Sequence, residues 1–207
     1  HKTATCLMDA NVCSIVTGIG LSYANSGPTH YSTEDFACLR ALPNSLIFTA
    51  SDPLVAKEIA VSTLKINKPT FIRLDRKSNQ NLKSNVSNQE IKKGFRFLKK
   101  NYNAKLAIVS HGTIIERALQ AYNILDNKLA DKINIIDLIQ SKPLPKSLTG
   151  HLKSYNKILT LDEQTIAGSL GSLIQENIDK KVTALALPDE FIFENLGRDK
   201  LLDKNNK

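Results

Sequence analysis

The chain has 207 residues, 42% of them hydrophobic, and a formal net charge of +8 at pH 7. This length and apolar content are enough to bury a sizeable core, which excludes an intrinsically disordered chain. No apolar run in the sequence approaches the roughly 20 residues that cross a bilayer, so a membrane protein is not expected.

The three cysteines, Cys6, Cys13 and Cys38, show no metal-ligand spacing. Their odd number, without a recognisable signal peptide, favours a reducing compartment, and we expect a cytoplasmic protein. All three are predicted to be small buried hydrophobic side chains. No cluster of His, Cys, Asp and Glu has the spacing of a metal site, so no metal-binding residue is predicted in this chain.

The positive charge is concentrated in one segment. Between Arg76 and Lys105 the only acidic residue is Glu90, whereas the basic residues are Arg76, Lys77, Lys83, Lys92, Lys93, Arg96, Lys99, Lys100 and Lys105. The flanking blocks are therefore neutral, and the excess charge belongs to a connector. Such a segment is typical of a solvated surface, and nucleic-acid binding is not expected from it.

The N-terminal block alternates strands and helices. A β-branched run predicts a strand over 12–16, and Ser32 with Asp35 predicts the capped start of a helix over 34–42. A strand is expected over 45–50, then a helix from an N-cap at Ser51 to about Ile66, and a strand over 70–74. This order predicts a parallel α/β unit with right-handed crossovers.

The second block follows a polar stretch without an apolar period. Strands are expected over 106–110, 133–139, 157–162 and 182–188, and helices after a capping box at Thr113 and Glu116 and within 145–156 and 167–178. The predicted fold class is α/β, with two parallel-sheet three-layer units. The predicted organisation is a first domain over 1–76, a basic linker over 77–104 and a second domain over 105–207.

The loop after the first strand holds the main candidate residue, His30. Gly27 and Pro28 predict a turn just before it, and a helix start follows it, so the backbone on both sides is constrained. Ligands of open parallel sheets bind outside the carboxyl ends of strands, where this loop lies. His30 is therefore placed to donate to an oxyanion or move a proton, unless it only bonds a neighbouring carbonyl.

Two arginines close the strand over 70–74. Arg73 and Arg76 lie at its carboxyl end, where a guanidinium suits bidentate phosphate binding. The alternatives are an ion pair with Asp75 or a solvated start of the linker. His111, in the corresponding loop of the second block, is more typical of a loop or helix-start residue than of a catalyst, and His151 is expected in a polar helix.

Several motifs resemble one family. "GLSY", "SGPTH", "ED", "LRALPN" and "SDP" occur in order between Gly20 and Pro53, followed by "PTFIRLDR". They resemble the pyrimidine-binding domain of transketolases, particularly the small C-terminal subunit of two-piece transketolases. "LAIVSHGT", "LTLDEQTIAGSLGSLI" and "LPDEFIFENLG" are similar to the family's C-terminal domain. The resemblance makes 1–76 part of a pyrimidine-binding domain and 105–207 a transketolase C-terminal-like domain.

The resemblance implies an enzyme that transfers a two-carbon ketol unit between sugar phosphates with thiamine diphosphate. His30 would contact oxygens of the donor and assist its proton transfers. Arg76 would hold a substrate phosphate, and the predicted substrate-binding residues are Ser26, Gly27, Thr29, Arg73 and Arg76. Ser26 stands where many transketolases carry an acidic residue, and Thr17 and Gly18 stand where many carry an upstream histidine.

The family's cofactor-activating glutamate and its "GDG" motif are not in this sequence. We therefore expect thiamine diphosphate and Mg²⁺ to be bound mainly by a partner, an N-terminal transketolase subunit, in a homodimer of heterodimers. Two alternatives stay open. One is a related enzyme, either like deoxyxylulose-phosphate synthase or a keto-acid dehydrogenase component. The other is a non-catalytic scaffold subunit.

Overall fold

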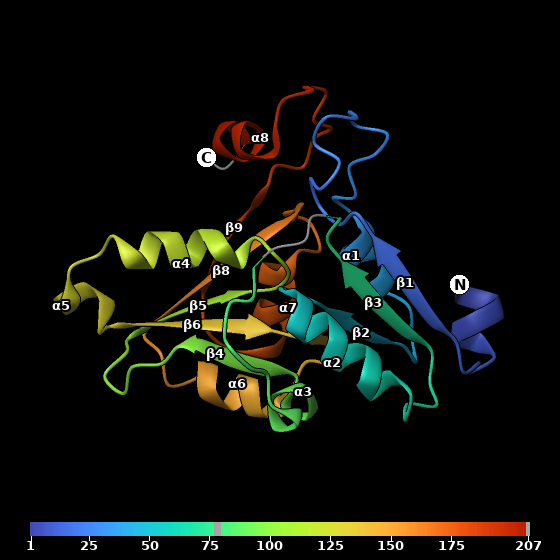
Figure 1. The fold of residues 1–207 in the computed structure, drawn as a ribbon, viewed down its shortest axis with the longest axis horizontal. Coiled ribbons are helices and arrows are strands. Elements are labelled where there is room, and N and C mark those ends of the chain that lie inside the picture. The colour runs from blue at the N-terminus through green and yellow to red at the C-terminus, as the bar shows by residue number, and fades with distance from the viewer. Residues whose placement is uncertain (77–79, 206–207) are drawn as a thin grey trace.

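The computed structural model describes residues 1–76 and 80–205 as two α/β units, each built on its own sheet (Figure 1). The first sheet has the strand order β1-β3-β2-β7, and the second has the order β4-β6-β5-β8-β9. Most neighbouring strands are parallel, and each sheet has one antiparallel strand at an edge, β7 or β4. The predicted fold class of two mainly parallel α/β units is confirmed.

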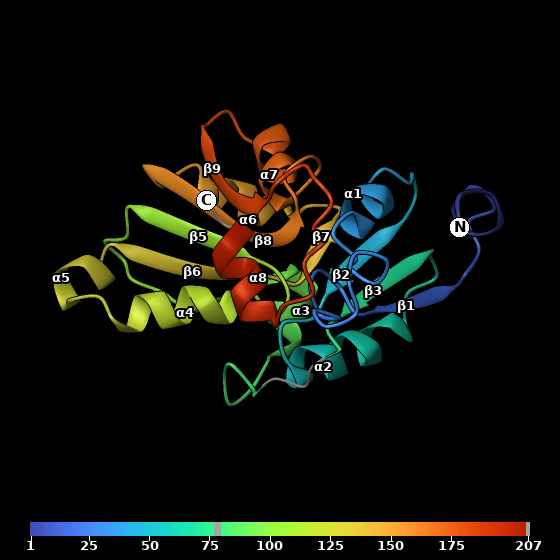
Figure 2. The ribbon, with the colours of Figure 1, turned by 90° about the horizontal axis from the view of Figure 1, so that it is seen from above.

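The first sheet consists of β1 (Cys13–Thr17), β3 (Thr70–Leu74), β2 (Leu46–Thr49) and β7 (Gln140–Lys142). Figure 2 shows α1 (Asp35–Arg40) and α2 (Pro53–Thr63) on opposite faces of this sheet. A short π-helix (Lys2–Leu7) precedes β1. The expected helix over 34–42 and the expected strands near 12–16, 45–50 and 70–74 are therefore present, with bounds shifted by one or two residues at most ends.

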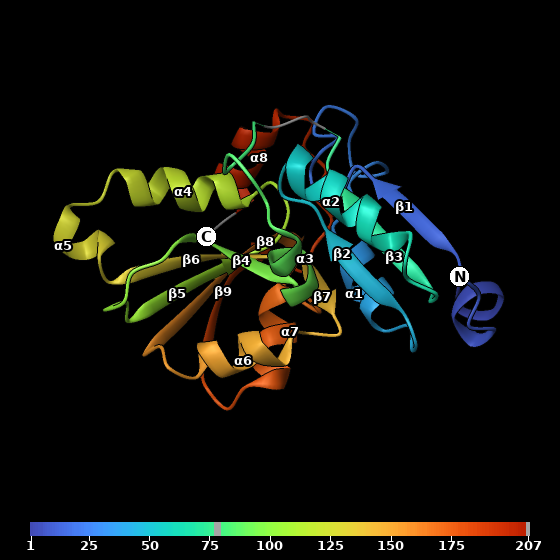
Figure 3. The ribbon, with the colours of Figure 1, turned by 60° about the horizontal axis from the view of Figure 1, so that its bottom comes forward.

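The second sheet consists of β4 (Phe95–Lys99), β6 (Ile133–Leu138), β5 (Leu106–Ser110), β8 (Lys157–Thr165) and β9 (Val182–Leu187). In Figure 3, α4 (Ile115–Asn123) covers one face, and α6 (Lys146–Leu152) and α7 (Leu170–Asn177) cover the other. The remaining helices are α3 (Asn88–Lys93), α5 (Asn127–Ala130) and α8 (Arg198–Asn205). Within residues 1–76 and 80–205, no helix is long and apolar enough to cross a membrane.

The two units share strands and core. After β6 the chain continues into β7, which leaves the second sheet and pairs antiparallel with β2 of the first. One apolar cluster contains Phe36 and Phe71 from the first unit together with Val109 and Leu138 from the second. The units are thus packed as one body rather than joined only by a connector.

The segment expected as a basic linker over 77–104 differs from that expectation where it is described. It contains α3, whose N-terminus is closed by a capping box between Ser87 and Glu90, and β4, a strand of the second sheet. Arg96 of β4 is buried rather than solvated, because its guanidinium bonds Asp52 at 2.6 Å and Asp137 at 2.9 Å. The boundaries 1–76, 77–104 and 105–207 stay a proposal for the domain division.

Several predicted helix caps are wrong, and two of the predicted capping side chains bond tertiary partners instead. Asp52, not Ser51, caps α2 by accepting from the Val55 amide, while Ser51 donates to Asp137. Glu34, not Ser32, is at the N-cap of α1 and makes no side-chain cap bond. Thr113 donates to Asp75 instead of closing a capping box with Glu116.

The prediction of three buried cysteines is correct only for Cys6. Cys13 and Cys38 are exposed. Cys13 lies on β1, which is at an edge of the first sheet, and Cys38 lies on the solvent side of α1. The prediction is therefore wrong for these two residues, because the burial of a single cysteine depends on which face of its strand or helix it occupies.

Two helical glycines predict opposite effects of alanine. A Cβ at Gly171 in α7 would lie 2.5 Å from Ala184 Cβ, whereas a Cβ at Gly150 in α6 would meet no atom within 4 Å. We expect Gly171→Ala to destabilise the protein by about 1–3 kcal/mol through overpacking. Gly150→Ala should stabilise it by about 0.5–1 kcal/mol, because glycine is the weaker helix former. Urea denaturation of the pair measures both, and equal midpoints would contradict this packing.

Candidate functional site

The loop from Gly18 to Ser32 leaves the carboxyl end of β1 and returns beside its own start. Gly20 and Ser32 exchange two backbone hydrogen bonds of 2.9 Å, which close the loop. Within it the His30 amide donates to the Gly27 carbonyl at 3.0 Å, and Gly27 has a φ of +79°. The turn predicted before His30 is therefore present, and Gly27 suits it because a residue with a Cβ would be strained at that φ.

His30 lies exposed at the end of this turn. Its Nδ1 is 3.0 Å from the Thr29 hydroxyl oxygen. The neighbour of His30 is thus a hydroxyl on the adjacent residue, and the alternative of a bond to a nearby carbonyl is not the arrangement seen. An exposed imidazole with one nitrogen engaged leaves the other nitrogen for a ligand.

Tyr23 connects His30 with Arg76. Its ring centroid is 6.0 Å from that of His30, and the Arg76 guanidinium carbon lies 4.7 Å over the same ring. The tyrosine ring packs directly against Gly18, where a Cβ would lie only 2.1 Å from a ring carbon. β1 and β3 end level, with Thr17 opposite Leu74, so the loop and Arg76 leave the same edge of the sheet.

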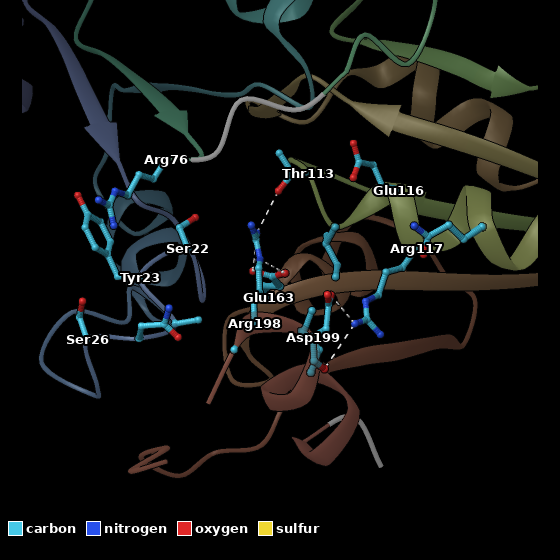
Figure 4. Close-up of a pocket in the computed structure, with 16 residues that line it drawn as sticks. Ser22, Tyr23, Ser26, Arg76, Thr113, Glu116, Arg117, Glu163, Arg198 and Asp199 are labelled. Atoms are coloured by element: carbon cyan, nitrogen blue, oxygen red, sulfur yellow. Dashed lines mark hydrogen bonds and ion pairs between the residues drawn. The ribbon is translucent and has the colours of Figure 1, made fainter. Parts of the chain in front are cut away.

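A polar pocket of about 370 Å³ opens beside these residues (Figure 4). Its walls come from the loop after β1, from Arg76, from the start of α4 and from the start of α8. The lining residues are Ser22, Tyr23, Ala24, Asn25, Ser26, Arg76, Thr113, Ile114, Glu116, Arg117, Gln120, Glu163, Gly197, Arg198, Asp199 and Leu202. Of the predicted site residues, the pocket brings together Ser26 and Arg76. Gly27, Thr29, His30 and Arg73 are outside this lining.

Arg73 lies inside the protein, with 1% of its side chain exposed. Its Nε and Nη2 bond the Asp35 carboxylate at 2.7 and 2.9 Å, and its Nη1 bonds the Thr49 hydroxyl at 3.1 Å. The guanidinium also lies 5.0 Å over the Phe36 ring. Arg73 thus holds α1 against the sheet, and in this arrangement it presents no edge to a phosphate. The ion-pair alternative was correct in kind, but the partner is Asp35 rather than Asp75.

His111 is a buried residue between the units. Its Nε2 is 2.9 Å from the Asp162 carboxylate, its Nδ1 is 3.3 Å from the Ser141 hydroxyl, and its ring packs edge-on against Phe36. Burial alone would raise the pKa of Asp162, but the charge and hydrogen bond of His111 hold that pKa below its ordinary value. The side chains of His111 and Asp162 are 2% and 3% exposed, so this pair lies inside the protein.

Comparison with known proteins shows which family the chain resembles. Residues 2–81 match the model of the transketolase pyrimidine-binding domain, and residues 97–197 match that of the transketolase C-terminal domain. The chain belongs to the transketolase family. It corresponds to the pyrimidine-binding and C-terminal domains of such enzymes, as the motifs around His30 predicted.

Curated relatives include 1-deoxy-D-xylulose-5-phosphate synthases. That of Psychromonas ingrahamii is 31% identical over 175 residues, covering 80% of this chain and 26% of the relative. That of Vibrio parahaemolyticus is 32% identical over 196 residues, covering 91% of this chain and 30% of the relative. The chain therefore spans about a quarter to a third of the length of these relatives.

Solved structures show the same fold. A split-gene transketolase described as an inactive beta4 tetramer has a TM-score of 0.79 at 24% identity, covering 99% of this chain and 64% of that one. Transketolase from Campylobacter jejuni has a TM-score of 0.78 at 20% identity, covering 97% of this chain and 30% of that one.

Members of the family use thiamine diphosphate, so we tested which part of this group the described residues fit. Over residues 1–76 and 80–205, no group of three His, Cys, Asp or Glu side chains could hold a metal ion. A diphosphate bound through a divalent cation needs such oxygen ligands. The described residues therefore show no such set of His, Cys, Asp or Glu donors for the metal-diphosphate end of the cofactor.

Sequence reasoning missed Tyr23, Glu163 and Arg198 of the pocket lining, and Asp75 as the ion-pair partner of Arg198. The spacing of Gly18, Gly20 and Tyr23 carried a usable signal, because a glycine facing an aromatic ring marks a close approach. No such signal marks Arg198 in the sequence, because its partners Asp75 and Glu163 lie in distant parts of the chain.

Proposed function

We propose that this chain is the C-terminal subunit or part of a thiamine-diphosphate-dependent transketolase, which transfers a two-carbon ketol unit between sugar phosphates together with a partner. The observation that carries the proposal is the grouping of His30 and Arg76 about Tyr23 at the carboxyl ends of β1 and β3. An imidazole, which is suited to proton transfer, and a guanidinium, which is suited to phosphate binding, therefore lie at one edge of the sheet.

His30 is proposed as the catalytic residue of this chain. With Nδ1 beside the Thr29 hydroxyl, Nε2 is the nitrogen left to face a substrate oxygen. From there it would donate a hydrogen bond where negative charge develops on that oxygen, or carry its proton. The turn at Gly27 holds the imidazole in place beforehand, so little reorganisation is needed. Ser26, Gly27 and Thr29 would line the substrate site next to His30.

Arg76 is proposed to bind the substrate phosphate. Its guanidinium is exposed and lies over the Tyr23 ring. Its N–H donors therefore remain available on the side of the pocket. We expect Arg76→Ala to raise the KM for a sugar phosphate by about ten- to hundredfold, the loss of one charge-assisted contact. Arg40→Ala is a matched control, because Arg40 pairs with Glu176 and does not line the pocket. An unchanged KM in the Arg76 variant, measured by steady-state kinetics, would contradict this role.

The cofactor and Mg²⁺ are proposed to be bound mainly by a partner chain that supplies the family's diphosphate-binding domain. Thiamine diphosphate would supply the carbon chemistry of ketol transfer, and this chain would bind and orient the substrate. The likeness to a split-gene transketolase chain whose tetramer is described as inactive supports this division.

The complete assembly is proposed to be a homodimer of such heterodimers. We place it in the cytoplasm, because the three free thiols suit a reducing compartment.

A second candidate is a reaction like that of 1-deoxy-D-xylulose-5-phosphate synthase, the enzyme to which the curated relatives belong. To decide, the reconstituted assembly is given xylulose 5-phosphate or pyruvate as donor, each with an aldose phosphate. Ketol transfer from xylulose 5-phosphate without turnover of pyruvate is the expected result. Carbon dioxide release from pyruvate would support the second candidate instead, and no turnover with either donor would favour a scaffold subunit.

A further inference from the structure

Arg198, the first residue of α8, lies at the centre of a charged network between the units (Figure 4). Its Nη1 is 2.7 Å from the Asp75 carboxylate, and its Nη2 is 2.8 Å from that of Glu163. Nη2 also donates to the Thr113 hydroxyl at 3.0 Å. One guanidinium thus binds two carboxylates whose side chains are only 3% and 7% exposed.

Each carboxylate reaches a different part of the candidate site. Asp75 directly precedes Arg76 and accepts a hydrogen bond of 2.8 Å from the Ser22 hydroxyl. Glu163 accepts a hydrogen bond of 3.1 Å from the Leu21 amide. Leu21 and Ser22 belong to the loop that carries His30, so this loop and the Arg76 segment are each fixed to Arg198 through one intermediate side chain.

The backbone is shaped for this contact. Gly20 has a φ of +60°, and a Cβ there would lie 2.6 Å from the Glu163 carboxylate. The loop approaches Glu163 this closely only because residue 20 lacks a side chain. Burial alone would lower the pKa of Arg198, but Glu163 and Asp75 outweigh burial and raise it, so the guanidinium stays charged.

The two carboxylates need a cation between them. Both are buried and carry like charges, and they lie against the same guanidinium. Without that cation they would repel each other or draw in water, and Asp75 and Glu163 would move together with the segments they hold.

We propose that Arg198 is a positioning residue, through which the C-terminal domain sets the spacing between Arg76 and the loop that carries His30. This rests on the proposed function, because it concerns how that site binds a sugar phosphate. Arg198 would act through Asp75 and Glu163. Removing its charge should therefore shift Arg76 relative to the loop, and with it the position in which the substrate phosphate is bound.

The first test measures hydrogen-deuterium exchange of the chain itself and needs no activity. In Arg198→Met, peptides that contain Leu21 and Ser22 should exchange about tenfold faster, because the Leu21 amide loses a fixed acceptor. Arg198→Lys should fall in between, since it keeps the charge but not the fork. The matched control is Lys204→Met, which removes a basic residue of the same helix that pairs with Glu194. Wild-type exchange at Leu21 in Arg198→Met would overturn the proposal.

The second test uses the active assembly and separates positioning from general damage. Arg198→Met should raise the KM for a sugar phosphate about tenfold and leave the KM for an unphosphorylated aldehyde acceptor unchanged, with partial recovery in Arg198→Lys. An equal rise for both acceptors would overturn a role in phosphate positioning. If the wild-type assembly transfers no ketol unit, the proposed function fails, and the exchange experiment alone decides on Arg198.

Discussion

His30→Ala should lower the kcat/KM for ketol transfer of the complete assembly by about 10²- to 10⁴-fold, the usual contribution of a positioned acid-base group. The imidazole is exposed, and it bonds the Thr29 hydroxyl of the same turn and lies beside the Tyr23 ring, so little of the fold depends on it. The unfolding midpoint should therefore stay within about 0.5 kcal/mol of the wild type. Steady-state kinetics with a ketose phosphate donor, together with thermal unfolding, measures both effects.

The matched control for this result is His151→Ala. His151 is an exposed histidine of α6 that packs edge-on against Phe95 and Phe97, away from the loop after β1. It should leave ketol transfer unchanged. Full activity in His30→Ala would remove the proposed catalytic role, whereas a loss of activity that merely follows a loss of folded protein would assign His30 to the structure of the loop.

Arg96→Met should destabilise the protein by about 3–5 kcal/mol, because it removes the cation from a fully buried network. Arg96 bonds Asp137 on the neighbouring strand and Asp52 at the start of α2, and all three side chains are 0% exposed. Burial alone would lower the pKa of Arg96, but the charges of Asp137 and Asp52 outweigh it and raise the pKa. The variant leaves two carboxylates buried without their partner, at the contact between the units.

Lys83→Met is the control for Arg96→Met, because Lys83 belongs to the same basic segment. Its pair with Glu90 spans 3.5 Å, and its side chain is 37% exposed. Such a pair contributes at most about 1 kcal/mol. Guanidinium chloride denaturation compares the two variants through their midpoints and slopes. Similar midpoints for both would show that Arg96 behaves as a surface charge.

The strands predicted from apolar runs are present. β3 and β6 are buried on both faces, and such burial leaves a continuous apolar signal in the sequence. β4 and β7 were missed for different reasons. In β4, the charge of Arg96 reads as solvated surface, although Asp52 and Asp137 neutralise it inside the fold. β7 is three polar residues long and exists only because β2 offers an edge.

The candidate site could likewise be predicted only in part from the sequence. The order of elements was enough to place the loop with His30 at the end of a strand. It was not enough to tell Arg73 from Arg76, since only the packed structure shows that Asp35 lies against Arg73. The contacts of Arg198 with Asp75 and Glu163 join residues from three separated segments, and no local pattern encodes them.

The most direct test of the central claim is native mass spectrometry of the protein, alone and mixed with a chain that carries the family's diphosphate-binding domain, with thiamine diphosphate and Mg²⁺ present. We expect a complex of both chains that carries cofactor, and no cofactor on this chain alone. A stable assembly of this chain that ignores the partner and the cofactor would contradict the account.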